Sequence, residues 1–377
     1  MEKNSPILIT GAGGFVGKNL VATLRTAGYT DLMLFEKDDT PETLADYCRR
    51  AAFVVHLAGI NRPTDPSEFY TGNAGLTDTL LANLEAVGNT APVLVTSSTQ
   101  AELDNDYGKS KRQAEEAIFA HRRRTGAMVY VFRMPGVFGK WCRPNYNSVV
   151  ATFCHNVAHG LPIQVRDSAF SLPLVYIDDV VACILAAFDG DVMMDRSATP
   201  ICHMHPIHEV TLGRLAELIQ GFAAGRTSLA VPDLAPGSFE KKLYSTYLSY
   251  LPSDQFSYPL EMHTDNRGSF TEFLRSPERG QVSINISHPG IVKGNHWHHT
   301  KNEKFLVVKG EGVIRFRNIF SKEVIEYHVS GDKLEVVDIP CGYTHNIENV
   351  GTEDMVTVMW ANEAFDPDHP DTFFEPV

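Results

Sequence analysis

The stretch "ILITGAGGFVGKNL", Ile7–Leu20, passes from a short apolar run through a glycine-rich turn into a helical pattern. Three glycines stand at the turn and the helix start: Gly11, Gly14 and Gly17. They would let the backbone turn tightly and approach a pyrophosphate, whose charge the helix N-terminus favours. Phe15 and Val16 open the helix and are expected to contact the same ligand. A plain turn does not need three glycines at this spacing, so the stretch predicts a dinucleotide-binding site.

Apolar runs and helical stretches alternate along the first part of the chain. The expected strands are "ILIT", "LMLF", "FVVHLAG", "VLVTSS" and "VYVFRM", and stretches such as "YGKSKRQAEEAIFAHRRR" lie between them. Strand–helix alternation at this spacing predicts an α/β domain with a doubly wound parallel sheet of the Rossmann type over residues 1–245.

The ends of the second and third expected strands carry further residues for a dinucleotide. Glu36 follows the second strand, where it could accept hydrogen bonds from an adenosine ribose, which favours NADH. Lys37 could instead meet the 2′-phosphate of NADPH. The third strand runs into "HLAG", whose last residues would line the cofactor: Leu57, Ala58 and Gly59.

A tyrosine and a lysine stand four residues apart in "VTSSTQAELDNDYGKSK". Tyr107 and Lys111 would share one face of a helix. A phenol with a pKa of about 10 transfers protons poorly at neutral pH until something stabilises its anion. A lysine ammonium one turn away, together with an oxidised nicotinamide, would do so. Ser98, or its neighbour Ser97, could hydrogen-bond the same substrate oxygen.

From about Thr264 the pattern changes to short strands separated by turns, with no helical period between them. Such a run predicts a small all-β barrel or double sheet. We expect this second domain to cover residues 246–377.

The stretch "GNHWHHTKNEKFLVVKG", Gly294–Gly310, concentrates histidines on one expected strand. Side chains alternate along a strand, so His296 and His298 point to one face and His299 points to the other. Two imidazoles on one face, with a carboxylate returning across a short turn, suit Zn²⁺ or another divalent metal.

The N-terminal motifs resemble a known family. Residues 6 to about 240 are similar to the extended short-chain dehydrogenase/reductases that act on nucleotide sugars, through "HLAG", "NAGLT", "FRMPGVFG" and "YIDDVV". The resemblance implies a catalytic group of Ser98, Tyr107 and Lys111. It also implies a nicotinamide cofactor that contacts Asn73, Tyr107 and Lys111.

The C-terminal part resembles the cupins. Its spacing from Gly290 is G-x₅-H-x-H-x₄-E-x₆-G, and "IPCGYTHNIEN" supplies the later P-x-G-x₂-H-x₃-N. The resemblance implies a double-stranded β-helix, or jelly-roll barrel. The metal ligands that it implies are His296, His298, Glu303 and His345.

The segment "TDNRGSFTEF" is similar to the entry strand of the deoxysugar 3,5-epimerases, which are also cupins and abstract a proton beside a keto group. Arg267, in this segment, is a candidate substrate contact. The usual base of those enzymes stands at the place of His296, which here resembles a ligand, so the base must lie elsewhere. The candidates are Lys304, Asp338 and Tyr343.

A reductase joined to a metal cupin resembles the bifunctional capsular-polysaccharide enzymes of the CapF type. The resemblance implies C3 epimerisation of a UDP-4-keto-6-deoxy-N-acetylhexosamine in the cupin, then reduction of the C4 ketone with NADPH. The product would be UDP-2-acetamido-2,6-dideoxy-L-talose, on the route to UDP-N-acetyl-L-fucosamine. A homodimer through the cupin is also implied. Contacts for the UDP diphosphate are expected from Arg133, Lys140 and Arg143.

Two alternatives stay open. One is a 4-ketosugar reductase whose cupin only holds a structural metal or dimerises the chain. The other is a non-catalytic, nucleotide-sensing cupin fusion. The Tyr107–Lys111 pair argues against the second alternative, because a binding module has no use for a proton-transfer group.

The length, charge and composition of the chain limit the classes of function that it can have. A chain of 377 residues suggests two domains, and its net charge of −13 argues against a nucleic-acid partner. The first residues lack a secretory pattern, and no apolar run approaches the ~20 residues of a membrane helix. The six cysteines are scattered without CxxC pairing, as in reduced cytosolic proteins. We therefore expect a cytoplasmic enzyme without a membrane partner.

Overall fold

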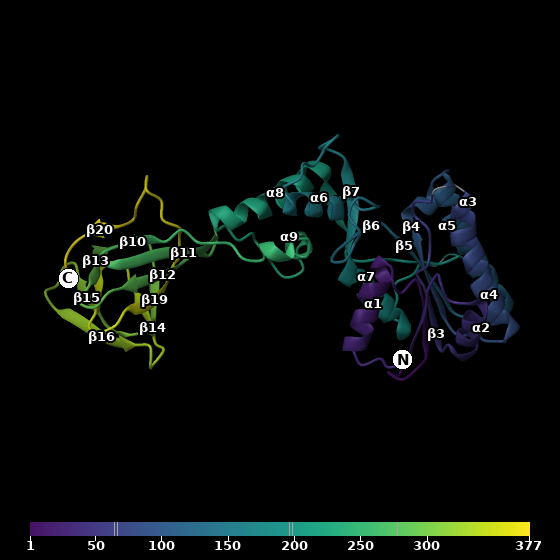
Figure 1. Cartoon of the computed structure of the whole chain (residues 1–377), viewed down its shortest axis with the longest axis horizontal. Helices are drawn as coiled ribbons and strands as arrows, with labels where there is room; N and C mark the ends of the chain where they lie inside the picture. The colour runs from purple at the N-terminus through teal and green to yellow at the C-terminus, as the bar shows by residue number, and fades with distance from the viewer. Residues whose placement is uncertain (64, 66, 196, 198, 277) are drawn as a thin grey trace. The chain divides into compact units, whose positions relative to one another are not determined.

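The computed structural model describes residues 1–377 except residues 64, 66, 196, 198 and 277 (Figure 1). The chain forms two compact units. The first comprises Met1–Gln220 and Pro236–Pro252, and the second comprises Gly221–Ala235 and Ser253–Val377. The division expected after residue 245 falls inside helix α9 (Phe239–Leu248), which lies in the first unit.

A six-stranded sheet forms the centre of the first unit. Its order is β2-β1-β3-β4-β5-β8, and every neighbouring pair is parallel. The strands are β1 (Ile7–Thr10), β2 (Leu32–Phe35), β3 (Phe53–His56), β4 (Val93–Ser98), β5 (Val129–Met134) and β8 (Ile201–Cys202). The predicted parallel sheet is confirmed.

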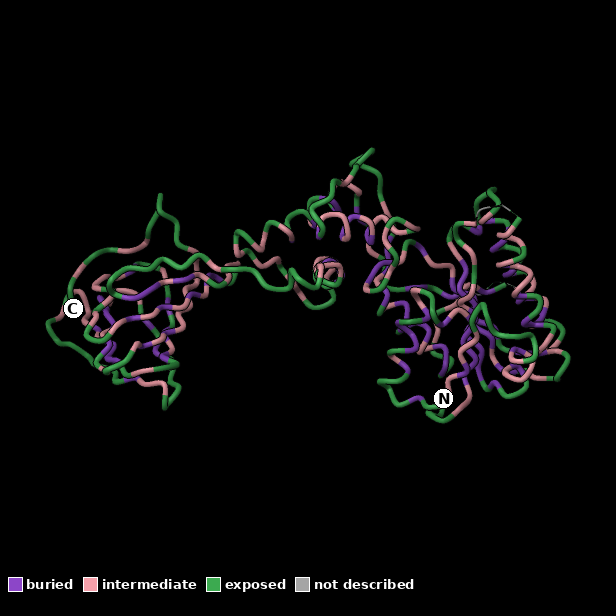
Figure 2. The backbone as a smooth tube through the Cα atoms, in the orientation of Figure 1, coloured by how far each residue is buried: buried purple, intermediate pink, exposed green. Residues whose placement is uncertain are grey.

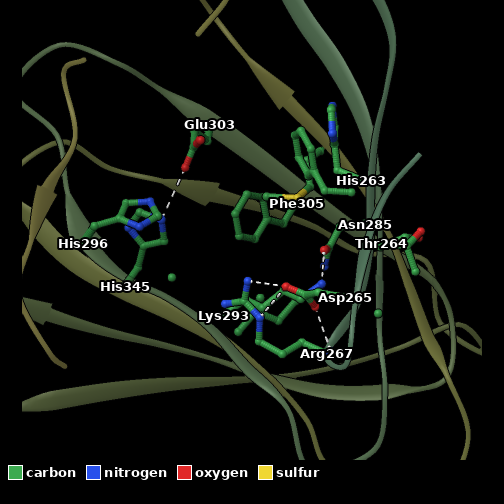
Figure 3. A pocket seen from close by; sticks show the side chains of 16 residues that line it. His263, Thr264, Asp265, Arg267, Asn285, Lys293, His296, Glu303, Phe305 and His345 are labelled. Atoms are coloured by element: carbon green, nitrogen blue, oxygen red, sulfur yellow. Dashed lines mark hydrogen bonds and ion pairs between the residues drawn. The ribbon is translucent and has the colours of Figure 1, made fainter. Parts of the chain in front are cut away.

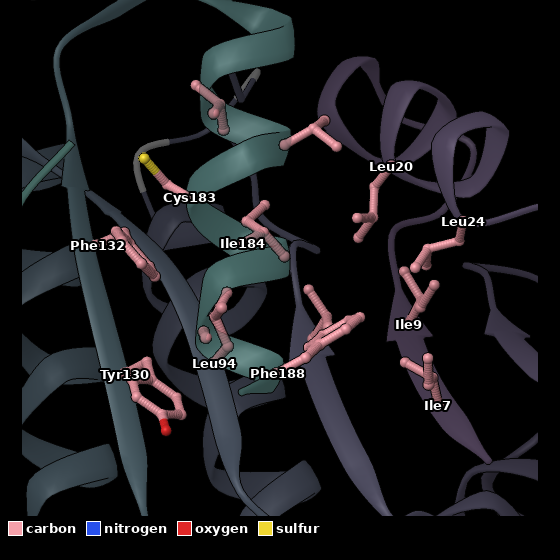
Figure 4. Close-up of a cluster of buried hydrophobic side chains, with 14 of the residues drawn as sticks. Ile7, Ile9, Leu20, Leu24, Leu94, Tyr130, Phe132, Cys183, Ile184 and Phe188 are labelled. Atoms are coloured by element: carbon pink, nitrogen blue, oxygen red, sulfur yellow. The ribbon is translucent and has the colours of Figure 1, made fainter. Parts of the chain in front are cut away.

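Helices cover both faces of this sheet. They are α1 (Phe15–Thr26), α2 (Pro41–Arg50), α4 (Leu76–Ala86), α5 (Asp106–Thr125) and α7 (Ile177–Phe188). Successive side chains of a strand point to opposite faces, so Ile7 and Ile9 pack with α1 and α7, while Leu8 packs with α2, α4 and α5. Figure 4 shows the first of these layers, in which Leu20 and Leu24 of α1 are fully buried. Burial of one such side chain contributes about 1.5–3 kcal/mol.

Smaller elements complete the first unit. Strands β6 (Gly136–Phe138), β7 (Ser171–Tyr176) and β9 (His208–Thr211) form a three-stranded sheet in the order β6-β7-β9. Helix α6 (Val149–Ala158) lies in this unit, and α8 (Leu212–Ser228) begins in it. The short helical segments are α3 (Ser67–Phe69), the π-helical turn η1 (Tyr70–Gly75) and the 3₁₀ turn η2 (Thr99–Glu102).

The second unit consists mainly of two antiparallel sheets and also holds the 3₁₀ turn η3 (Ser253–Gln255). One sheet has the order β10-β11-β12-β19-β14-β17 and the other β16-β15-β18-β13-β20. The strands are β10 (His263–Asp265), β11 (Gly268–Ser276), β12 (Gly280–Ser287), β13 (Val292–Trp297), β14 (Glu303–Lys309), β15 (Glu311–Asn318), β16 (Val324–Ser330), β17 (Val336–Ile339), β18 (Tyr343–Asn349), β19 (Met355–Ala361) and β20 (Phe373–Phe374).

Apolar side chains from both sheets meet in one core. Phe305 and Val307 come from the first sheet, and Ile314, Phe316 and Ile347 come from the second. Buried residues lie along the inner strands of this unit, as they do along the parallel strands of the first unit (Figure 2). The predicted all-β barrel of the cupin type is confirmed. None of the described helices is both long and apolar enough to cross a membrane.

Candidate active site and candidate metal centre

The glycine turn after β1 is packed too closely for larger residues. Gly11 has a φ of +70°, and a Cβ added to it would lie 2.8 Å from the Cα of Ala58. A Cβ on Gly17 would lie 2.3 Å from the carbonyl oxygen of Gly11. Gly14 is the N-cap of α1, and the backbone N–H of Gly13 donates to the carboxylate of Glu36. The turn therefore joins the N-terminus of α1 to the end of β2, as a dinucleotide site requires.

A cavity of about 670 Å³ opens beside this turn. Its lining includes Gly13, Glu36 and Trp141, and also Lys18 and Arg25 of α1. Sequence reasoning considered only the end of β2 and missed these two cations. Their spacing of about two helical turns could have revealed them, because residues so spaced share a helix face. Lys37 does not line this cavity.

The loop after β3 reaches the same region as helix α5. The backbone N–H of Leu57 donates to the carbonyl oxygen of Thr10 over 3.1 Å, which extends the sheet pairing. A Cβ on Gly59 would lie 2.8 Å from Oδ1 of Asn73 and 3.1 Å from Nζ of Lys111. Asn73 also donates to Oγ of Ser110 over 3.0 Å. Three of the residues predicted for the cofactor, Gly59, Asn73 and Lys111, are thus brought together.

Tyr107 and Lys111 lie one turn apart at the start of α5. The side chain of Asn105 caps this helix by accepting from the N–H of Gly108 over 2.8 Å. Nζ of Lys111 lies 5.9 Å from the centroid of the Tyr107 ring. Ser98, at the end of β4, hydrogen-bonds Tyr107 and lowers its pKa, although burial raises that pKa by more. The predicted trio is assembled as the sequence indicated.

The buried carboxylate of Glu115 acts electrostatically on Lys111. Burial lowers the pKa of Lys111 to about 8, and the negative charge of Glu115 opposes the effect. Glu115 accepts from the hydroxyl of Ser97 over 2.5 Å and from the guanidinium of Arg133 over 2.9 and 2.7 Å. Arg133 also donates to Glu102 over 2.9 Å. Arg133, expected at the substrate diphosphate, is therefore occupied by two carboxylates.

The other cations expected near substrate have separate partners. Lys140 pairs with Asp178 over 2.5 Å, and the guanidinium of Arg143 lies 5.2 Å from the centroid of the Tyr146 ring. Neither contact involves Ser98, Tyr107 or Lys111. In the second unit, Arg267 pairs with Asp265 over 2.6 Å.

The four predicted metal ligands converge in the second unit; Figure 3 shows three of them, His296, Glu303 and His345. They are His296 of β13, His298 just after it, Glu303 at the start of β14 and His345 of β18. One ligand atom from each lies within 4.8 Å of the others. Oε2 of Glu303 lies 3.3 Å from Nε2 of both His298 and His345. Strand pairing thus unites residues from three places in the sequence.

Asp371 orients this cluster from a distant part of the chain. Its backbone carbonyl accepts a hydrogen bond from Nδ1 of His298 and so fixes the orientation of that ring. The other ring nitrogen, Nε2, then faces Glu303. Its carboxylate accepts backbone N–H bonds from His299, Thr300 and Lys301 over 2.9, 2.7 and 2.9 Å. Those bonds overcome burial and hold the pKa of Asp371 well below its usual range. No local pattern in the sequence signals this contact.

The chemistry of the cluster fits a divalent cation. Burial and the neighbouring His345 lower the pKa of His296 to about 4, so its imidazole offers a lone pair at neutral pH. Burial opposes ionisation of Glu303, but His298 and His345 outweigh it and hold the pKa of Glu303 well below its usual range. Nδ1 of His345 is buried without a hydrogen-bond partner among the described residues, and its Nε2 meets only the Glu303 carboxylate at 3.3 Å. Buried polar atoms in native proteins have partners, and a coordinated cation would be one.

Three residues of the cluster, His296, Glu303 and His345, line a cavity of about 490 Å³, and the expected bases do not all reach it. Along β14, Glu303 and Phe305 face the cavity, so Lys304 faces the outside, where it pairs with Asp338. The expectation that Lys304 or Asp338 acts in the cavity therefore conflicts with strand alternation. Tyr343 packs against the apolar core. Lys293, which was not considered, does line the cavity.

Comparisons with known proteins agree with both halves of the chain. Residues 7–195 match the model of the NAD dependent epimerase/dehydratase family, and residues 263–373 match the Polysaccharide biosynthesis C-terminal domain. The chain is 46% identical over 367 residues to UDP-2-acetamido-2,6-beta-L-arabino-hexul-4-ose reductase of Pseudomonas aeruginosa, with 97% of each chain covered. It is 25% identical over 122 residues to the spore coat polysaccharide biosynthesis protein SpsL of Bacillus subtilis, covering 30% of this chain and 81% of SpsL.

A solved structure covers nearly the whole chain. The capsular polysaccharide assembling protein CapF of Staphylococcus aureus shares 52% identity with it, at a TM-score of 0.91. The match covers 98% of this chain and 100% of the CapF chain. The chain therefore belongs to the NAD dependent epimerase/dehydratase family and, along nearly its full length, to the group that contains CapF and the hexulose reductase.

Proposed function

We propose that this chain is a bifunctional nucleotide-sugar enzyme. Its second unit would epimerise C3 of a UDP-4-keto-6-deoxy-N-acetylhexosamine, and its first unit would reduce the C4 ketone of the product. The proposed end product is UDP-2-acetamido-2,6-dideoxy-L-talose, on the route to UDP-N-acetyl-L-fucosamine for a surface polysaccharide. The observation that carries the proposal is the presence, in one chain, of an assembled Ser98–Tyr107–Lys111 trio and a cavity lined by the metal cluster.

The first unit's residues fit the reduction step. A reduced nicotinamide would supply a hydride to C4 of the sugar. Tyr107 then gives its phenolic proton to the C4 oxygen, which becomes a hydroxyl, and Ser98 holds that oxygen by a hydrogen bond. The ammonium of Lys111 stabilises the tyrosinate that remains. Glu115 keeps Lys111 protonated by raising its pKa against the effect of burial.

The second unit's residues fit an epimerisation. A divalent cation such as Zn²⁺, held by His296, His298, Glu303 and His345, would supply positive charge beside an oxygen of the substrate that becomes an enolate. Asp371 keeps the ring of His298 oriented toward that position. Structural metal sites are usually closed, whereas catalytic sites keep an open side. The cavity of about 490 Å³ at this cluster favours epimerisation over a cupin that only binds a structural metal.

NADPH is the proposed cofactor. Lys18 and Arg25 line the cavity beside Glu36, where the adenosine ribose of a dinucleotide would lie. Two cations there favour a 2′-phosphate, despite the carboxylate of Glu36. A homodimer through the second unit is also part of the proposal and rests on the likeness to CapF.

A mixing experiment tests the proposed sequence of reactions. Tyr107→Phe removes the proton donor of the reduction, and His345→Ala removes one ligand of the cluster. Each variant alone should give none of the talose product from the 4-keto sugar and NADPH, and a mixture of the two should give it. Failure of the mixture, with both variants folded, would contradict two independent sites acting in series. Product from Tyr107→Phe alone would contradict the reductase assignment.

A further inference from the structure

The cavity at the metal cluster has a second polar wall, formed by Lys293, Asn285, Asp265 and Arg267 (Figure 3). None of these residues belongs to the cluster. The proposed epimerisation needs a group that removes the proton from C3, and the cluster itself supplies no free base. The outward-facing Lys304 and Asp338 do not line this cavity. The second wall is therefore the place to look for the base.

A β-bulge turns Lys293 into the cavity. On a regular strand, residues three apart face opposite sides, so Lys293 and His296 would be separated. The register of β13 against β18 pairs Lys293 with Ile347 and Gly294 with Asn346, then shifts, so that His296 pairs with His345. The extra residue, Asn295, and Gly294 have left-handed φ angles of 60° and 106°. The bulge therefore brings Lys293 and His296 to the same side.

Neighbouring chain segments hold the bulge in place. The side chain of Asn346 donates to Oδ1 of Asn295 over 2.9 Å. The backbone N–H of Glu375 donates to the carbonyl oxygen of Asn295 over 2.9 Å. A Cβ on Gly294 would lie 2.8 Å from the carbonyl oxygen of His345, so this position accepts only glycine without rearrangement. Bulges beside active sites commonly redirect a side chain, and this one redirects an amine.

The amine of Lys293 has one free tetrahedral position. Nζ donates to Oδ1 of Asn285 and to the carbonyl oxygen of Ile286, both over 2.8 Å. Asn285 is buried and is itself fixed by its bond to Oγ of Ser287 over 3.1 Å. With Cε and two hydrogen bonds in place, the fourth position of Nζ carries either one proton or the lone pair.

The surroundings make that proton easier to remove. Burial lowers the pKa of Lys293, Asp265 opposes the effect and Arg267 adds to it. Both hydrogen-bond acceptors are neutral, and the carboxylate that raises the pKa of Lys293, that of Asp265, is itself paired with Arg267 over 2.6 Å. No acceptor carboxylate among the described residues therefore holds the amine in its charged form by a direct bond.

We propose that Lys293 is the base that removes the C3 proton in the epimerisation. This inference rests on the proposed function of the second unit. The C3–H bond breaks, its electron pair forms the C3–C4 double bond of an enolate, and the proton passes to Nζ. Water then supplies a proton to the opposite face of C3 as the C4 carbonyl re-forms, and Nζ returns its proton to solvent.

Two substitutions of Lys293 distinguish a role in proton transfer from a role of its positive charge alone. Lys293→Met removes the amine and keeps most of the side-chain volume. Lys293→Arg keeps a cation and its donors but cannot give up its proton at neutral pH. If Lys293 only attracted the UDP diphosphate, the Arg variant would stay active. If it is the base, both variants fail.

The test measures exchange of the C3 hydrogen for deuterium by NMR, with the 4-keto sugar in D₂O and no NADPH. We expect Lys293→Met and Lys293→Arg each to slow exchange by at least about 10²-fold, the usual contribution of general base catalysis. In both Lys293 variants, the amount of bound zinc should match that of the wild type. The rate of NADPH oxidation with the already epimerised ketone should match it as well. Lys304→Met tests the rival lysine. Lys309→Met is the matched control, because Lys309 is an exposed lysine at the end of the same strand, β14, and pairs with Glu353.

Several outcomes would overturn the inference. Exchange within about twofold of the wild type in either Lys293 variant shows that its amine is not the base. Loss of exchange in Lys304→Met, with exchange retained in Lys293→Met, assigns the base to Lys304. If Lys293→Met does not fold, Lys293→Arg decides alone. The proposed function fails separately if the wild type shows no exchange, or if Glu303→Gln exchanges as fast as the wild type.

Discussion

In the first unit, the side chains proposed for proton transfer and for holding the substrate oxygen are close in the sequence. Tyr107 and Lys111 share one helix, and Ser98 ends the strand just before it. In the second unit, the proposed ligands come from three places and meet only through strand pairing, with His296 opposite His345. A carbonyl of Asp371, from the C-terminal segment, completes that site. A helix thus presents its chemistry locally, whereas the barrel depends on long-range register.

The difference extends to what stabilises the charges. In the first unit, protein groups balance one another: Glu115 is paired with Arg133 and acts on Lys111. In the second unit, a carboxylate and three imidazoles face one another, and Nδ1 of His345 has no hydrogen-bond partner among the described residues. Protein groups therefore balance the charges of the first site, whereas we propose that a bound cation balances those of the second. Four predictions test this contrast, from the largest expected effect to the smallest.

Tyr107→Phe should separate the two sites most sharply. Without the phenolic proton, reduction of the 4-keto sugar should fall by about 10³-fold, because general acid catalysis contributes 10² to 10⁴. Exchange at C3 in D₂O should be unchanged, since the second unit keeps its own groups. The measurement is NADPH oxidation beside C3 exchange on the same preparation. A parallel loss of both activities would mean that the sites are not independent.

His345→Ala should affect the second unit alone. We expect loss of bound zinc, loss of C3 exchange and a lower unfolding temperature for the second unit. A cation present at 1,000 times its Kd stabilises a fold by about 4 kcal/mol, which corresponds to a shift of roughly 10 °C. Calorimetry with and without a chelator measures the shift, and Tyr107-dependent reduction of the epimerised ketone is the control. An unchanged zinc content would contradict the proposed ligand set.

Lys18→Met combined with Arg25→Met should weaken binding of NADPH but not of NADH. Each exposed contact with the 2′-phosphate contributes about 0.2–1 kcal/mol, so loss of both should raise KM for NADPH by about twofold to thirtyfold. Turnover at saturating NADPH should stay the same. Arg49→Met, which alters an exposed arginine of α2 paired with Asp46, serves as the matched control. Equal effects on both cofactors would remove the case for a 2′-phosphate site on α1.

Glu115→Gln should shift the pH dependence of reduction. Lys111 has a pKa of about 8, so its ammonium is present below that pH and is lost as the pH rises through it. Glu115 raises the pKa of Lys111, and its neutralisation should therefore move the alkaline fall in activity to lower pH. Activity at pH 7 should change only a few-fold. Glu116→Gln, an exposed neighbour on α5, should leave the profile in place. An unmoved profile in Glu115→Gln would remove the electrostatic role of this carboxylate.

Much of this molecule could be predicted from its sequence where a local pattern carries the information. The glycines before α1 and the Tyr107–Lys111 spacing predicted the first site, and alternation correctly placed His296 beside His298. The same alternation excludes Lys304, which is adjacent to Glu303 and must face the other way.

Other features could not be predicted, and each has a physical reason. Lys293 enters the cavity only because the bulge at Asn295 reverses the alternation, and a one-residue irregularity leaves no periodic signal. Asp371 contacts His298 across 73 residues of sequence. The pairing of Arg133 with Glu115 joins strand β5 to helix α5 through a partly buried ion pair. Contacts of this kind depend on the folded register and not on local spacing.

The central claim is that one chain inverts C3 and then reduces C4. Its most direct test is NMR of the product formed by the wild-type enzyme from the 4-keto sugar and NADPH in D₂O. The account predicts a talose product with deuterium at C3 and protium, delivered from NADPH, at C4. A C4-reduced product with protium and unchanged configuration at C3 would contradict it and leave the second unit without a catalytic role.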